Sequence, residues 1–103
     1  MPRFIVRVEL PGKAAADYAA LHKDMWHANF RRVIEGSTGW LHLPHAEYTC
    51  SADDWTAGEI RDEVRDIAKQ HHDNARVFVT QSAKWASSGL RPVTDADPAP
   101  DDS

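Results

Sequence analysis

The sequence is poor in cysteine and contains no long apolar run. Its 103 residues include a single cysteine, Cys50, which excludes an internal disulfide. Six histidines without paired cysteines also lack the spacing of a zinc finger. The absence of a run of about 18 apolar residues leaves no candidate membrane-spanning helix. Since no signal-peptide pattern is present either, we expect a cytoplasmic protein without a membrane partner.

Positive charge is also scarce. Lysine and arginine number 12 against 16 aspartates and glutamates, which gives a net charge of −4. Residues 91–103 carry one arginine and four aspartates, so the remainder of the chain is nearly neutral. Tight non-specific binding to nucleic acid requires many phosphate-neutralising cations. The composition therefore argues against such binding, although it leaves room for a local basic patch.

The amino-terminal segment has the pattern of a buried strand. In Arg3–Leu10, Phe4, Val6 and Val8 alternate with mainly polar residues, and β-branched side chains predominate. A proline–glycine pair follows, which is typical of a turn. Three further segments are predicted as strands from their β-branched and aromatic content: Phe30–Glu35, Glu47–Ser51 and Arg76–Thr80.

Two segments have helical periodicity. Ala14–Ala28 is rich in alanine and places Leu21 and Met25 on one apolar stripe, and Asn29 is a suitable stop because asparagine tolerates the left-handed conformation. The second helix runs from Thr56 to about residue 70. Its threonine is followed three residues later by a glutamate, as in a capping box.

The remaining segments are less regular. Trp40–Pro44 either extends a strand or forms a structured loop, and Ser82–Leu90 is predicted to contain a short helical turn. Residues 91–103 are rich in proline and aspartate and are predicted to be disordered. We therefore expect one domain over residues 1–90 and an acidic tail over residues 91–103.

The predicted order of elements is β-α-β-β-α-β. This order predicts an α+β fold of the ferredoxin-like type, with one antiparallel sheet and two helices on one of its faces. The open face and the edges of such a sheet must be covered or solvated. We therefore expect a homodimer that uses this exposed sheet surface.

Four short motifs are distributed over most of the chain. Glu9 and Pro11 end the first strand, an L-x3-M-x3-N-F pattern crosses the first helix and its exit, and an A-x-E-I-x-D-x-[IV]-R pattern runs along the second helix. The first-helix pattern is formed by Leu21, Met25, Asn29 and Phe30, and the second-strand position is Ile34. The second-helix pattern is formed by Ala57, Glu59, Ile60, Asp62, Val64 and Arg65. From about residue 4 to residue 79 the chain resembles the GhoS family of small antitoxins, which are reported as sequence-specific endoribonucleases.

The resemblance implies both a fold and an activity. GhoS proteins have a ferredoxin-like fold similar to that of the small CRISPR-associated nuclease that forms homodimers. The resemblance thus implies an RNA-directed antitoxin that cleaves a toxin mRNA. A basic residue of the first helix is thought to be important in the family. The matching position here is His22, and the loop before the third strand is shorter and carries Trp40.

The candidate catalytic residues are His22, Arg31 and Arg32. Metal-independent RNA cleavage needs a base for the 2′-hydroxyl, an acid for the leaving oxygen and a cation for the phosphate. Histidine suits the first two roles because its usual pKa lies near neutrality, and arginine suits the third. The candidate RNA-binding residues are Lys23, His27, Trp40, His42 and His45. No cofactor is expected, and Glu9 is only a weak candidate for a metal ligand.

The alternative is a non-catalytic module of the same fold, a small dimer that binds a protein or regulates one. Each histidine has an ordinary explanation as an exposed or hydrogen-bonded side chain, and tryptophans near an apolar stripe are more often core or dimer contacts. An endoribonuclease is expected to have a basic patch around His22, Lys23, Arg31 and Arg32. A protein-binding module is expected to have an exposed apolar patch near Trp26 or Trp40 instead.

Overall fold

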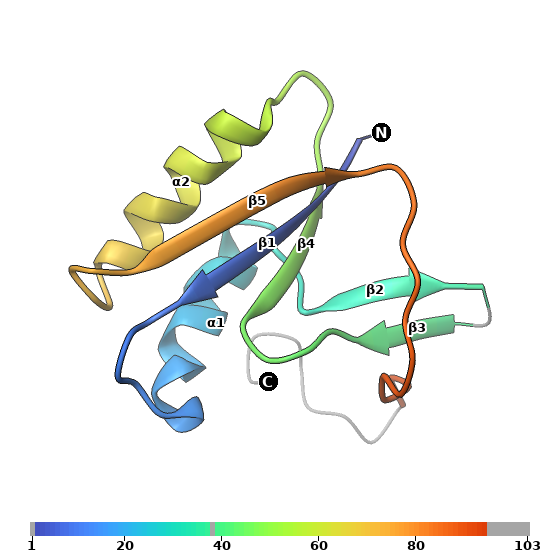
Figure 1. Cartoon of the computed structure of the whole chain (residues 1–103), viewed down its shortest axis with the longest axis horizontal. Helices are drawn as coiled ribbons and strands as arrows, with labels where there is room; N and C mark the ends of the chain where they lie inside the picture. The colour runs from blue at the N-terminus through green and yellow to red at the C-terminus, as the bar shows by residue number, and fades with distance from the viewer. Residues whose placement is uncertain (1, 38, 95–103) are drawn as a thin grey trace.

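The computed structural model describes residues 2–37 and 39–94. Within these residues the chain forms a small α+β fold of five strands, two α-helices and one 3₁₀ helix (Figure 1). In chain order they are β1 (Arg3–Glu9), the 3₁₀ helix η1 (Ala15–Tyr18), α1 (Ala19–His27), β2 (Val33–Gly36), β3 (Gly39–His42), β4 (Glu47–Ser51), α2 (Ala57–Lys69) and β5 (Arg76–Ser82).

The main sheet is antiparallel and has the order β4-β1-β5. The register places Val6 of β1 opposite Tyr48 on one side and Val79 on the other. Because β4 and β5 both run antiparallel to β1, they are parallel to each other, and α2 connects them past the intervening strand. The predicted antiparallel sheet with two helices on one face is confirmed, since α1 and α2 lie on the same side of the sheet (Figure 1).

The core lies between this sheet and the two helices. Phe4, Val6 and Val8 of β1 are at most 1% exposed, which confirms the predicted alternation of the strand. The helices contribute apolar residues at spacings of three and four: Leu21, Met25, Ile60, Val64 and Ala68. No helix of the described residues covers the opposite face of the sheet, so every second residue of β1 and β5 faces away from the helices.

The second predicted strand, Phe30–Glu35, does not follow the edge of the main sheet. Arg31 makes one antiparallel bridge with Thr49 of β4, with N–O distances of 2.8 and 2.6 Å. The backbone pairing with β4 ends there, because the next two carbonyls do not bond to backbone amides of β4. The Arg32 carbonyl accepts from Leu43 N at 2.9 Å, and the Val33 carbonyl accepts from the Thr49 hydroxyl at 2.7 Å.

In place of a fourth strand in the sheet, β2 pairs with β3 in a separate hairpin, with Glu35 opposite Trp40. The continuous four-stranded sheet of the predicted ferredoxin-like fold is therefore not found among the described residues. The segment that we left open between strand and loop, Trp40–Pro44, provides most of β3.

One prediction for the carboxy-terminal region is wrong. Ser82–Leu90 forms no helical turn, since β5 continues to Ser82 and Gly89 has a φ of 77°, outside the helical range. Residues 91–93, predicted to be disordered, pair with the outer edge of β3. The His42 amide donates to the Arg91 carbonyl at 2.9 Å, and the Val93 amide donates to the Trp40 carbonyl at 3.0 Å. The rest of the predicted tail, residues 95–103, lies outside the described residues.

The helix ends follow the sequence signals closely. The first predicted helix begins with the 3₁₀ turn η1 and ends at Asn29, whose φ of 73° confirms the left-handed stop. The capping box of α2 is also confirmed. Glu59 N donates to Thr56 Oγ1 at 3.1 Å, and Thr56 N donates to a carboxylate oxygen of Glu59 at 3.0 Å.

Replacing the cap is expected to destabilise the fold measurably. Thr56→Ala removes the side-chain acceptor for an otherwise unpaired helix amide, so we expect a loss of about 1 kcal/mol in the free energy of unfolding. Urea denaturation checks this value. Ser87→Ala, at an exposed serine outside the helices and strands, is the control and is expected to have no effect. An unchanged midpoint in Thr56→Ala would show that the cap contributes nothing.

Candidate functional site

A histidine–tyrosine pair is buried under α1. His22 is only 5% exposed, and its Nδ1 shares a hydrogen bond of 2.6 Å with the hydroxyl of Tyr48 on β4. Tyr48 is completely buried. The sequence brings them together because His22 follows the core residue Leu21 on the helix, and Tyr48 is an inward-facing residue of its strand. The hydrogen bond satisfies two polar groups that burial removes from water.

A second histidine, His45, lies beside this pair in the turn before β4. Its ring packs edge-on against Tyr18, with centroids 4.5 Å apart, and its centroid is 6.0 Å from that of His22. Tyr18 is held in place by the Leu10 amide, which donates to its hydroxyl at 2.8 Å. Unlike His22, His45 is exposed. The next residue, Ala46, has a φ of 65°, a strained conformation of the kind found at functional sites.

Arg32 adds a positive charge to the same place. Its side chain is half-buried, and its charge acts on both His22 and Tyr48. Its Nε is buried and has no hydrogen-bond partner among the described residues. A buried donor without a partner is uncommon in a purely structural residue. We refer to the five residues that meet here as the histidine cluster: Tyr18, His22, Arg32, His45 and Tyr48.

Burial controls the protonation of this cluster. Desolvation, with Arg32 and His45 adding to it, lowers the pKa of His22 to about 4. His22 is therefore neutral at pH 7, and its expected pKa near neutrality does not hold. Burial raises the pKa of Tyr48 above its usual value and lowers that of the Arg32 guanidinium. His45 is the exposed histidine of the cluster.

The other predicted residues of α1 and its exit make different contacts. The Arg31 guanidinium lies 4.7 Å from the centroid of the Trp26 ring, and its Nη1 donates to the Trp26 carbonyl at 2.8 Å. Arg31 thus satisfies a carbonyl at the end of α1. Lys23 and His27 are exposed, and His27 packs edge-on against Trp26. The predicted basic patch is incomplete, because Lys23 is the only one of its four side chains that is fully exposed.

The hairpin and the end of β1 hold the remaining predicted residues. Trp40 and His42 lie on β3, away from α1 in sequence, and Trp40 is 50% exposed. Glu9 forms an exposed ion pair of 2.5 Å with Arg76 of β5, which is the ordinary explanation for a carboxylate at a strand end. No group of three or more histidines, cysteines or acidic residues in the described part of the chain is arranged to hold a metal ion.

Cys50 is a free, partly buried cysteine of β4. Its side chain packs against the core on the same face of β4 as Tyr48, two residues earlier in the strand. Burial, with Glu63 as a further cause, raises the pKa of its thiol to about 11. A thiol that stays protonated at pH 7 is a poor nucleophile.

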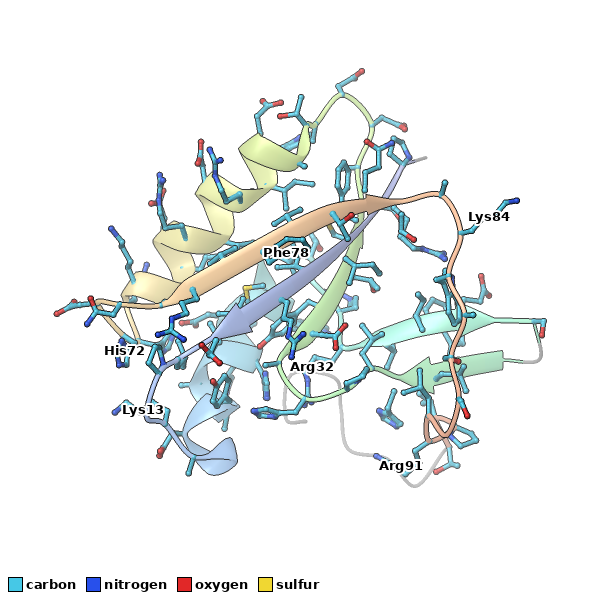
Figure 2. The ribbon with its side chains drawn as sticks, in the orientation of Figure 1. Lys13, Arg32, His72, Phe78, Lys84 and Arg91 are labelled. Atoms are coloured by element: carbon cyan, nitrogen blue, oxygen red, sulfur yellow. The ribbon has the colours of Figure 1, made fainter. Side chains whose placement is uncertain are left out.

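The sequence predicted an open face of the sheet, but sequence reasoning missed the exposed phenylalanine on it. Phe78 of β5 is 68% exposed and lies directly opposite Arg7 of β1, with the Glu9–Arg76 pair beside it (Figure 2). The available signal was the alternation in RVFVT. Val77 and Val79 face the core, so Phe78 must face away from it.

The comparisons with known proteins leave the family open. No protein-family model matches the chain, and no curated protein matches it either. In the part of the chain that the structure describes, no helix has the length and apolar content needed to cross a membrane.

Proposed function

We propose that this protein is an RNA-directed, GhoS-like antitoxin and that it is an endoribonuclease acting at the histidine cluster. One observation carries the proposal: two histidines and an arginine from three separate segments converge where one histidine is exposed. His22 comes from α1, Arg32 from the segment before β2, and His45 from the turn before β4. The combination of imidazole and guanidinium groups is the one that metal-independent RNA cleavage requires.

In this mechanism His45 is the general base. It takes the proton of a 2′-hydroxyl, the 2′-oxygen bonds to the adjacent phosphorus, and the bond from phosphorus to the 5′-oxygen breaks. The departing 5′-oxygen takes a proton from water, which leaves a 2′,3′-cyclic phosphate. Arg32 and the exposed Lys23 neutralise the phosphate. His22 is a positioning residue, because it is buried, is held by the Tyr48 hydroxyl and lies edge-on to the ring of His45.

The fold gives partial support to the ferredoxin-like part of the proposal. The order β4-β1-β5 is that of three neighbouring strands in such a fold. The bridge between Arg31 and Thr49 stands where the fourth strand would pair. We propose that the fold is a ferredoxin-like one in which this strand is reduced to a single bridge. A homodimer is also part of the proposal, since β5 is an edge strand of the described sheet.

The test is cleavage of RNA by the purified full-length protein in the presence of EDTA. We expect products with 2′,3′-cyclic phosphate ends. An oligonucleotide with a single 2′-deoxy substitution at the mapped cleavage site is the matched control and is expected to resist cleavage. Cleavage of that substrate would exclude attack by the 2′-oxygen. Failure to bind any RNA at low salt would overturn the RNA-directed function altogether.

A non-catalytic protein-binding module is the second candidate. It is favoured by the large apolar side chains that remain exposed, above all Phe78 at 68% and Trp40 at 50%. The two candidates differ in their response to salt. Binding to RNA weakens steeply as the salt concentration rises, whereas an apolar protein contact does not.

A further inference from the structure

Two pockets adjoin along the free edge of β4. The larger has a volume of about 230 Å³ and the smaller about 150 Å³, and both are lined by Asn29, Cys50 and Ser51. Together they form a groove with Trp55 at one end and Trp40 at the other. We refer to it as the β4 groove. The chain leaves the edge of β4 after the single bridge at residue 31, and within residues 2–37 and 39–94 no further strand pairs with this edge.

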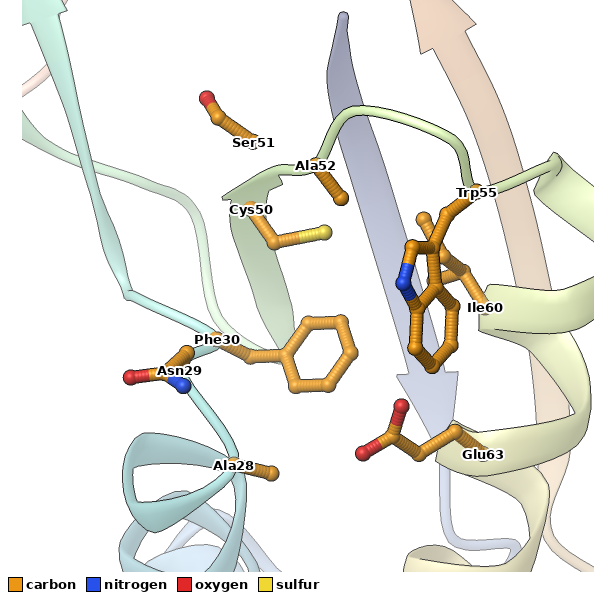
Figure 3. A pocket seen from close by; sticks show the side chains of 9 residues that line it. All are labelled: Ala28, Asn29, Phe30, Cys50, Ser51, Ala52, Trp55, Ile60 and Glu63. Carbon is orange, nitrogen blue, oxygen red and sulfur yellow. The ribbon is translucent and has the colours of Figure 1, made fainter. Parts of the chain in front are cut away.

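The larger pocket has aromatic walls and an acidic floor. The Trp55 indole, 43% exposed, faces the Phe30 ring and the Cys50 sulfur across the opening, and the Glu63 carboxylate lies between them (Figure 3). This shape suits a flat ring. A ring that stacks on Trp55 would present its edge to Glu63, which accepts hydrogen bonds but donates none when ionised. The pocket therefore favours a base that carries an exocyclic amine.

The smaller pocket supplies the positive charge. It is lined by Arg3 of β1 and by Arg31, whose guanidinium is already held against Trp26. Trp40 is half-exposed at its rim, and Glu35, its cross-strand partner, is the acidic residue there. Cations between two accessible tryptophans are the arrangement that proteins use for single strands, in which bases stack and phosphates meet arginines.

We propose that the β4 groove binds single-stranded RNA, with bases stacked on Trp55 and Trp40 and a phosphate held by Arg3 and Arg31. Glu63 selects cytosine, adenine or guanine over uracil at the Trp55 end. The choice of RNA as the ligand rests on the proposed function. The groove itself is separate from the histidine cluster, and it would hold the substrate while the cluster acts on it.

The experiment titrates the full-length protein with fluorescently labelled oligocytidylate, oligoadenylate and oligouridylate of equal length at low salt. The first two are expected to bind more tightly than oligouridylate. Trp55→Ala and Trp40→Ala are each expected to weaken binding roughly tenfold. Trp85→Ala, at a tryptophan with 37% exposure outside both pockets, is the matched control and should bind as the wild type does.

Two further variants distinguish the loss of a contact with RNA from a loss of folding. Glu63→Gln is expected to remove the preference against uridylate, and Arg3→Gln to lower the slope of log affinity against log salt by about 1. Unchanged binding in both tryptophan variants, with RNA still bound, would overturn the groove but not the RNA-directed function. Absence of RNA binding by the wild type would overturn both. Binding of a lysine-rich peptide at Trp55 without RNA binding would reassign the groove to a protein ligand and overturn the proposal.

Discussion

Lowering the pH from 7 to 4.5 is expected to cost the wild-type protein roughly 2 to 3 kcal/mol of unfolding free energy through His22 alone. The folded protein keeps this side chain neutral, since its pKa is lowered to about 4 from an ordinary value of 6.5. The unfolded chain binds a proton at 6.5, so the contribution is fully present above that pH. It is lost as the pH falls from 6.5 to about 4.

The variant that isolates this effect is His22→Asn. An asparagine amide keeps a polar group near the Tyr48 hydroxyl but does not titrate. We expect the variant to be less stable than the wild type at pH 7 and to lose much less stability between pH 7 and pH 4.5. Urea denaturation at the two pH values measures both losses, and the carboxylates contribute equally to each protein.

The control for this comparison is His27→Asn, an exposed histidine on the same helix. It should lose as much stability on acidification as the wild type. If the wild type and His22→Asn lose the same amount, His22 is protonated in the folded state at mild acidity and the cluster is more open than its burial indicates.

A loss of RNA cleavage by about 100-fold or more is expected for His45→Ala. Removal of a positioned general base typically has an effect of that size. The side chain is exposed and packs edge-on against Tyr18, so its removal should leave the free energy of unfolding nearly unchanged. The rate of cyclic-phosphate formation measures the chemistry, and binding to an all-deoxy analogue measures affinity, which should change little.

His72→Ala is the control for this result, because His72 lies after α2 and outside the histidine cluster. It should cleave RNA at the wild-type rate. Equal activity of His45→Ala and the wild type would remove His45 from the mechanism. Preparing all three proteins in the same way also reveals a contaminating nuclease, which would give the same rate in each.

The elements that local patterns define were predictable from the sequence. β1, α2 and the stop at Asn29 each follow from a periodicity or a capping signal within a few residues. The separation of β2 from the sheet was not predictable, because the contacts of β2 with β4 join residues far apart in the chain, such as Thr49 and Val33, which are 16 positions apart. The pairing of residues 91–93 with β3 was not predicted either, because it joins segments distant in the chain and the prediction for residues 91–103 rested on composition alone.

The candidate site shows the same division. The sequence singled out His22 and Arg32, and the structure brings both into the histidine cluster. The sequence did not indicate that Tyr48 would form a hydrogen bond with His22, or that His45 would be the exposed histidine of the cluster. Protonation, too, depends on tertiary burial, which neighbouring residues in the chain do not encode. The groove beside β4 likewise brings together several segments that are distant in the chain.

The central position of β1 has a consequence for how the chain folds during synthesis. β1 emerges first, yet one of its two neighbours is β5, and the contact between Glu9 and Arg76 joins residues 67 positions apart. Until β5 has left the ribosome, one edge of β1 has no strand to pair with. The core residues that β5 would cover are also exposed to solvent. Closure of such long loops is slow. A nascent chain that pauses before β5 therefore exposes an unpaired strand edge and apolar side chains, which favour aggregation.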